Sequence, residues 1–210
     1  MTKTNTVESQ LNGQKIIPVV AIENKQQALG LASALIEGGI NVIEITLRND
    51  FGIHAIEIVK KAFPKMLVLA GTVNSAQDAV DVVNAGAQGI VSPGITEALI
   101  AKISDLNVSY LPGIATPSDV LVAMDAGLSE CKLFPATVVG GVGALKAYGG
   151  PFGKIQFCPT GSVNEKNYQD FLALPNVMCV GGSWVSPNAM IQAQDWVGIT
   201  SLCKSAIAPL

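Results

Sequence analysis

The chain has 210 residues, enough for one large domain or two small ones, and 49% of them are hydrophobic against 14% that are charged. Its net charge of −3 argues against nucleic acid or an anionic membrane surface as a partner. Every apolar run falls short of the roughly 18 residues that cross a membrane, and the polar first ten residues lack the apolar core of a signal peptide, so we expect a cytoplasmic protein.

Short apolar runs recur along the whole chain. Each is typical of a buried strand in a parallel sheet, which is covered on both faces. Successive runs start roughly 20 to 26 residues apart, which leaves room for one strand, one helix and two tight loops. The predicted strands cover residues 16–22, 42–47, 66–70, 89–91, 108–111, 130–134, 155–158 and 177–180.

Helix signals lie between these runs. Residues 26–37 end at two glycines, which is a helix C-terminal signal. Ser75 is placed to cap a helix that runs to residue 85, with Asp78 completing an approximate capping box. Thr116 or Ser118 begins the helix that closes before residue 127. A last helix over residues 187–207 is expected either to close the barrel floor or to pack on a neighbour.

Eight strand-helix units in about 200 residues predict an α/β protein of the (β/α)₈ TIM-barrel class. The alternative is an open doubly wound sheet, but no G-x-G-x-x-G motif follows the first strand. No linker divides the chain, so we expect a single domain over residues 1–210 with a short polar extension at about 1–14.

A lysine interrupts the sixth strand. Lys132 stands in the apolar run CKLFP, and lysine is among the residues that proteins bury least often. A lysine amine that has lost its solvation and its proton is a nucleophile whose targets are carbonyl carbons, with which it forms Schiff bases. The alternative is a lysine that extends from an edge strand into water.

The second strand places polar residues inside the predicted barrel. Side chains alternate faces along a strand, so Glu44, Thr46 and Arg48 share the inward face. Such a row is costly unless it has a partner or a use, and a structural ion pair is the simpler explanation. Arg48 is the only arginine, and its planar fork is suited to a carboxylate. His54, the only histidine, is expected on a helix or loop rather than as a catalytic base.

Polar residues also follow the last strands, at the end of a barrel where active sites lie. On the sixth strand, Lys132 and Phe134 share a face by the same alternation. The Gly/Ser loops at 161–162 and 182–183 follow the seventh and eighth strands, where such barrels bind phosphate through backbone N–H groups. The set indicates Schiff-base chemistry on a phosphorylated 2-oxo acid.

The sequence also resembles a known family, the 2-keto-3-deoxy-6-phosphogluconate (KDPG) and 4-hydroxy-2-oxoglutarate (KHG) aldolases. The resemblance runs from about residue 18 to residue 187. It is carried by GGINVIEITLR (38–48), AGTV (70–73), VSPG (91–94), LPG (111–113), KLFPA (132–136), GPF (150–152), FCPTG (157–161) and GGSW (181–184). These enzymes are class I pyruvate aldolases with a (β/α)₈ barrel, and they are commonly homotrimers that need no metal or other cofactor.

The resemblance implies a role for each matching residue. Lys132 would form the imine with the substrate, and Glu44 would be the general acid and base. The product pairs would be pyruvate with glyceraldehyde 3-phosphate, and pyruvate with glyoxylate from KHG. The substrate pocket would contain Arg48, Thr72, Pro93, Phe134 and Thr160, and the phosphate would be held by Gly161, Ser162, Gly182 and Ser183.

One position departs from the family pattern. Ser162 stands where the family usually has a second glycine, and a positive φ there would strain a serine. The departure leaves open the preference between phosphorylated and unphosphorylated substrates. The sequence also leaves open the C4 configuration, and hence a galactonate-type substrate. Two further alternatives are another phosphate-binding barrel enzyme, such as an epimerase, and a non-catalytic barrel that binds sugar phosphates.

Overall fold

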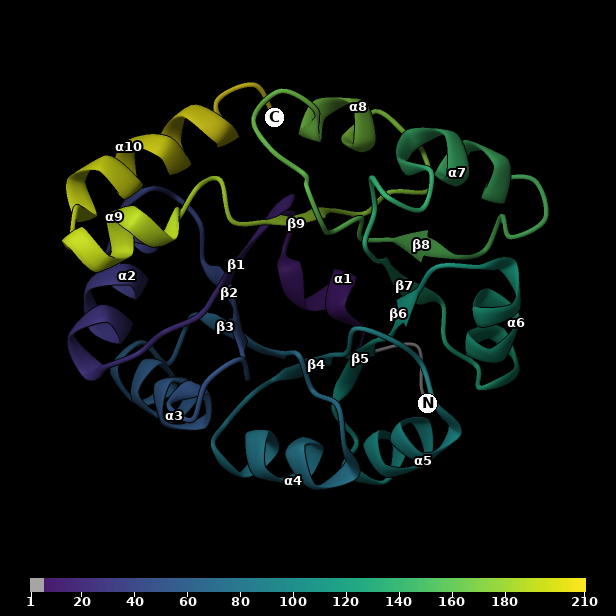
Figure 1. Cartoon of the computed structure of the whole chain (residues 1–210), viewed down its shortest axis with the longest axis horizontal. Helices are drawn as coiled ribbons and strands as arrows, with labels where there is room; N and C mark the ends of the chain where they lie inside the picture. The colour runs from purple at the N-terminus through teal and green to yellow at the C-terminus, as the bar shows by residue number, and fades with distance from the viewer. Residues whose placement is uncertain (1–5) are drawn as a thin grey trace.

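The computed structural model describes residues 6–210, and its strands form a parallel barrel that helices surround (Figure 1). The strands are short and almost entirely buried. They are β1 (Ile16–Val20), β2 (Val42–Thr46), β3 (Leu67–Gly71), β4 (Gly89–Val91), β5 (Ser109–Leu111), β6 (Gly113–Ile114), β7 (Glu130–Leu133), β8 (Gln156–Phe157) and β9 (Val180–Gly182).

The strand order closes the barrel. One run of paired strands is β5-β4-β3-β2-β1-β9, and the other is β6-β7-β8. Only Pro112 separates β5 from β6, so the two runs are continuous there: β5 pairs with β4, and β6 pairs with β7. Two isolated parallel bridges, Phe157 with Val177 and Thr160 with Gly181, join the other ends. The predicted α/β barrel class is therefore confirmed.

Most helices lie on the outside of this ring, as Figure 1 shows. Their apolar faces pack against the strands, which is the arrangement expected when every strand is buried on both sides. They are α2 (Lys25–Glu37), α3 (Gly52–Ala62), α4 (Ala76–Asn84), α5 (Glu97–Leu106), α6 (Pro117–Asp125), α7 (Gly141–Tyr148), α8 (Tyr168–Leu172), α9 (Asn188–Ala193) and α10 (Trp196–Ile207). No helix of residues 6–210 is long and apolar enough to cross a membrane.

The predicted helix starts are confirmed where capping residues mark them. Ser75 caps α4, and its capping box with Asp78 is complete. Of the two candidates for α6, Thr116 is the cap, and Asp119 completes a second capping box. These signals are local hydrogen bonds to the first backbone N–H groups, so the sequence shows them directly.

Two predictions near the C-terminal end of the chain are wrong. The last strand begins at Val180 rather than at residue 177, because Val177 makes only an isolated bridge. The expected single helix over 187–207 is two helices, α9 and α10. The break is at Gln194, whose φ is 55°, and the Asp195 side chain then accepts a hydrogen bond from the N–H of Gly198 to begin α10.

The last helix covers the outside of the barrel instead of its floor. It lies against α2, where the Thr200 hydroxyl donates to the Ala34 carbonyl at 3.1 Å. Gly30 of α2 and Gly38 at its C-cap leave the space that Trp196 and Cys203 of α10 occupy, because a Cβ at either glycine would overlap these side chains.

The floor is instead closed by α1 (Val7–Leu11), whose Val7 and Leu11 are fully buried. The segment expected as a polar extension at about 1–14 thus contains a helix that is part of the core, while residues 1–5 lie outside the described part. Glu130 at the start of β7 accepts the N–H groups of Val7 at 2.7 Å and Glu8 at 3.0 Å, which ties α1 to the barrel. The extent of the single domain, residues 1–210, stays a prediction.

Candidate active site

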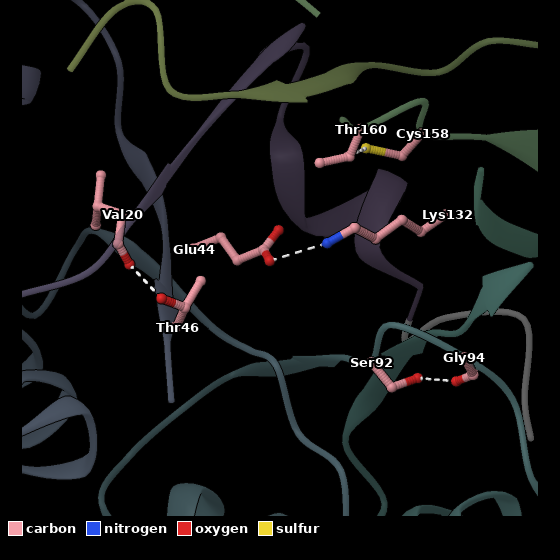
Figure 2. A network of polar contacts seen from close by, with 8 residues as sticks. All are labelled: Val20, Glu44, Thr46, Ser92, Gly94, Lys132, Cys158 and Thr160. Carbon is pink, nitrogen blue, oxygen red and sulfur yellow. Dashed lines mark hydrogen bonds and ion pairs between the residues drawn. The ribbon is translucent and has the colours of Figure 1, made fainter. Parts of the chain in front are cut away.

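A buried lysine and a buried glutamate meet inside the barrel. The Lys132 Nζ lies 3.1 Å from the Glu44 Oε1, and the two residues are only 5% and 3% exposed. Figure 2 shows the side chains extending toward one another, Glu44 from β2 and Lys132 from β7. A buried amine that donates a hydrogen bond to a carboxylate brings a nucleophile and an acid–base group together.

Strand alternation accounts for the direction of both side chains. The Lys132 Nζ lies 5.2 Å from the centroid of the Phe134 ring, so the two side chains lie on the same side as predicted, although β7 ends one residue before Phe134. Cys131 and Leu133 alternate with them and pack fully buried in the hydrophobic core. The alternative of a lysine that reaches water from an edge strand is wrong, because β7 is paired on both sides and Lys132 is buried.

Gly71, at the end of β3, is a residue that the sequence reading missed. A Cβ at this position would overlap the Oε1, Cγ and Cδ atoms of Glu44. The glycine therefore leaves the volume that the Glu44 carboxylate occupies. The signal was the glycine in the motif AGTV, at the end of a strand, where a side chain would otherwise point into the barrel beside Glu44.

The next residue, Thr72, has a strained backbone. Its φ is 60°, and a β-branched residue seldom adopts the left-handed region. Strain of this kind persists only where the surroundings impose it, and it gathers at functional sites. Thr72 is half-buried, directly after the strand that passes Glu44, which suits a residue that touches substrate.

The polar row on β2 is shorter than predicted. Thr46 is buried, and its hydroxyl donates to the Val20 carbonyl of β1 at 2.9 Å. The strand ends at Thr46, so the alternation that placed Arg48 inside the barrel stops before that residue. Arg48 is exposed in the loop after β2, and no ion pair to it is found within residues 6–210. His54 is exposed on α3, 3.6 Å from Glu57, as expected of a helix residue.

Pro93 is exposed in the loop after β4, beside a buried hydroxyl pair that the sequence reading did not identify. The Ser92 Oγ lies 2.8 Å from the Tyr110 hydroxyl and donates to the Gly94 carbonyl at 2.5 Å. Burial raises the pKa of Tyr110 to about 12. Because a Cβ at Gly113 would overlap the Pro93 carbonyl, these strand ends approach one another closely.

Thr160 lies at the seam between β8 and β9. It is 5% exposed, and its hydroxyl lies 3.8 Å from the Cys158 Sγ (Figure 2). Gly181 is its bridge partner, and a Cβ at Gly181 would overlap the Thr160 hydroxyl. Because Gly181 has no side chain, the Thr160 hydroxyl can occupy this space.

The two Gly/Ser loops lie side by side beyond this seam. Gly161 has a φ of 105° and Ser162 a φ of 57°, so the predicted strain at the serine is present. Gly182 is buried, and a Cβ there would meet the Trp184 ring and come within 3.1 Å of the Val163 carbonyl oxygen. Ser162 and Ser183 are exposed.

The described residues contain no group of three or more His, Cys, Asp or Glu side chains that is arranged to hold a metal ion. The pair of Lys132 and Glu44 offers the chemistry of an amine and a carboxylate.

Comparisons with known proteins show the family to which the chain belongs. The family model for KDPG and KHG aldolase matches residues 7–202. A 2-dehydro-3-deoxy-phosphogluconate aldolase of Dickeya dadantii is 43% identical, over 97% of this chain and 95% of its own length. The KHG/KDPG aldolase of Escherichia coli K12 is 42% identical, over 96% and 95%.

Among solved structures, a KDPG aldolase of Legionella pneumophila is similar over 95% of this chain and 97% of its own. The TM-score is 0.92 and the sequence identity is 41%. That structure holds pyruvate captured at low pH as a covalent carbinolamine intermediate.

Proposed function

The chain belongs to the KDPG and KHG aldolase family, and we propose that it cleaves KDPG to pyruvate and glyceraldehyde 3-phosphate with Lys132 as nucleophile and Glu44 as acid and base. KHG, which yields pyruvate and glyoxylate, is the second substrate. The observation that carries the assignment of these two residues is the buried pair, whose Nζ and Oε1 lie 3.1 Å apart.

The reaction starts with the amine. Once Lys132 has passed a proton to Glu44, the neutral Nζ attacks the C2 carbonyl carbon and forms a carbinolamine. Glu44 then returns the proton to the hydroxyl of the carbinolamine. The hydroxyl leaves as water, and a protonated imine remains. The positive imine then draws electrons from the neighbouring bonds.

Cleavage uses the same carboxylate. Glu44 removes the proton of the C4 hydroxyl, the C3–C4 bond breaks, and its electron pair moves through C3 into the imine to form an enamine. The C4 hydroxyl becomes an aldehyde, and glyceraldehyde 3-phosphate leaves. Glu44 then gives its proton to C3 of the enamine, and water hydrolyses the resulting imine to release pyruvate and Lys132.

The mouth of the barrel supplies the rest of the proposed site. Arg48 and Thr72 hold the carboxylate of the 2-oxo acid, and the loop position of Arg48 lets its side chain reach a substrate from outside the strands. Pro93 and Phe134 shape the pocket, and Thr160 contacts substrate hydroxyls. The phosphate lies between the paired loops that contain Gly161, Ser162, Gly182 and Ser183.

Borohydride trapping tests the central assignment. The protein is incubated with pyruvate and then reduced, after which intact mass and peptide mapping locate the adduct. We expect one reduced pyruvate adduct on Lys132, because only an imine is reduced to a stable secondary amine. A Lys146→Ala variant, altered on the surface helix α7, should label normally, and Lys132→Ala should not label at all.

An adduct on another lysine, or none, would remove Lys132 from the mechanism. A protein that neither labels nor turns over would favour the non-catalytic sugar-phosphate barrel instead. Turnover of the galactonate-type isomer in place of KDPG would establish the other C4 configuration. We also propose that the protein is a cytoplasmic homotrimer. The resemblance to the family supports this part of the proposal.

A further inference from the structure

Two asparagine side chains hold the strained residue of the phosphate loop. The Asn164 Nδ2 donates to the Ser162 carbonyl at 3.0 Å, and the Asn167 Nδ2 donates to the same oxygen at 3.1 Å. Ser162 has a φ of 57°, a conformation in which the Cβ of any residue but glycine crowds the following carbonyl. The two hydrogen bonds therefore stabilise a backbone conformation that serine seldom adopts.

The orientation of both amides is set by the backbone. The Asn164 Oδ1 accepts the N–H of Lys166 at 2.9 Å, and the Asn167 Oδ1 accepts the N–H of Asn164 at 2.8 Å. A backbone N–H can only donate, so an oxygen must occupy each of these places. The amide nitrogens consequently face Ser162, and a flipped side chain would lose two hydrogen bonds.

The pair completes a series of anchored carbonyls along the loop. The Thr160 carbonyl accepts the N–H of Ala136 at 2.8 Å, and the Gly161 carbonyl accepts that of Thr137 at 3.4 Å. In a trans peptide, the C=O and the next N–H point in opposite directions. Anchoring the Ser162 carbonyl thus sets the direction of the N–H of Val163.

Neither asparagine contributes to the hydrophobic core. Asn164 is exposed and Asn167 is half-buried, so truncating them leaves no cavity. Their hydrogen bonds connect the loop to the start of α8, close to the buried Gly182 of the second loop. Their placement is thus better suited to shaping the loop than to stabilising the barrel.

We propose that Asn164 and Asn167 are positioning residues that hold Ser162 in the left-handed conformation and so set the affinity for the phosphate of the substrate. They act through the backbone of Ser162 and do not touch the substrate. The proposal rests on the function proposed above, in which this loop binds phosphate, and it names the residues on which preference for the phosphorylated substrate depends.

The test is a set of steady-state measurements with KDPG and with unphosphorylated KHG. In Asn164→Ala/Asn167→Ala, the KM for KDPG should rise about tenfold. Substrate binding must then supply the free energy of one left-handed residue, which corresponds to a change in affinity of that order. The kcat, and the KM for KHG, should change by less than about twofold. Ser162→Gly should restore the KM of the double variant, because glycine adopts a positive φ without support.

Two results would overturn the proposal in favour of a general structural role. One is a rise in KM that is equal for KDPG and KHG. The other is a rise in the KM for KDPG that is as large when Ser162→Gly is added to the double variant as without it. Asn107→Gly is the matched control, since Asn107 has a φ of 52° at the end of α5. A change in the KDPG-to-KHG ratio in this control would also overturn it. Failure of the proposed function is distinct: the unsubstituted protein would then neither cleave KDPG nor trap pyruvate on Lys132.

Discussion

At the scale of single residues, the site depends on one ion pair that stability alone does not explain. Taking a lysine and a glutamate out of water costs several kcal/mol per ion before their attraction is counted, and well-packed apolar residues are often as stable. The pair between Lys132 and Glu44 is therefore weak evidence for a structural role. Its place inside the barrel, with Glu44 midway along β2 and Lys132 next to the carboxyl end of β7, is suited to a nucleophile and its proton carrier.

Replacement of the carboxylate tests its proton-transfer role. In Glu44→Gln, we expect turnover to fall by about 10²–10⁴-fold, because an amide cannot accept the C4 hydroxyl proton. Some pyruvate should still be trapped on Lys132. The two properties are measured by steady-state kinetics and borohydride labelling, with Glu57→Gln on the surface of α3 as control. Near-normal turnover would exclude Glu44 as the general base.

The space beside Glu44 is a second test. Gly71→Ala should lower kcat by about 100-fold, since the new Cβ displaces the carboxylate and a misplacement of about 1 Å costs that much. Gly143→Ala is the matched control, because a Cβ at Gly143 on α7 meets nothing within 4 Å. If both variants have the same kcat as the unsubstituted protein, the position of Glu44 does not depend on Gly71.

At the scale of elements, β7 connects the floor of the barrel to its mouth. Glu130 and Lys132 are two positions apart and so share one face of β7, and Phe134 follows directly after the end of the strand. Glu130 ties down α1, Lys132 pairs with Glu44, and Phe134 lies over the lysine amine. Burial raises the pKa of Glu130, against the effect of the hydrogen bonds that its carboxylate accepts.

The raised pKa predicts how stability depends on pH. Folded Glu130 holds its proton more tightly than the unfolded chain does, whose value is near 4.5, so unfolding releases a proton between the two pKa values. The contribution of Glu130 to stability is consequently greatest below pH 4.5 and declines as the pH rises through the folded pKa. Glu130→Gln should abolish this part of the pH dependence.

Removal of the whole side chain should lower stability at pH 7. In Glu130→Ala, the N–H groups of Val7 and Glu8 both lose their acceptor, and the free energy of unfolding should fall by about 1–3 kcal/mol. Urea denaturation at several pH values measures both effects, with the exposed Glu97→Gln and Glu97→Ala as matched controls. If the Glu130 variants match the Glu97 variants in stability and pH dependence, Glu130 does not anchor α1.

At the scale of the whole molecule, the two ends of the barrel have different tasks. The amino ends of the strands are closed by α1, whereas residues with strained backbones, such as Thr72 and Ser162, follow the carboxyl ends. The outer surface also exposes Leu121, Val122 and Met124 of α6. Three neighbouring apolar side chains on one helix are what a subunit contact would cover.

The proposed homotrimer is tested by light scattering. The expected mass is about three times the 21.8 kDa of one chain. Leu121→Lys/Met124→Lys should lower this mass if α6 lies in the contact, and the matched substitution Val197→Lys on α10 should not. A mass of one chain in the unsubstituted protein would contradict the trimer.

The sequence by itself determined what depends on local pattern. Apolar runs and glycine punctuation predicted the strand-helix units, capping residues predicted helix starts, and alternation placed Glu44 and Lys132 on inward faces. Each of these follows from the backbone geometry of a few neighbouring residues. Local signals failed where a turn interrupted a regular pattern, at the end of β2 before Arg48 and at Gln194 within the C-terminal segment.

Only the tertiary structure decided which of these residues meet. Glu44 and Lys132 are 88 residues apart, and their 3.1 Å contact depends on strand order, register and closure of the barrel. The space beside Gly71, the α1 helix on the floor and the asparagine pair at Ser162 likewise depend on which segments the fold brings together. A periodic sequence shows which way a side chain points, but only packing of the whole chain shows what it points at.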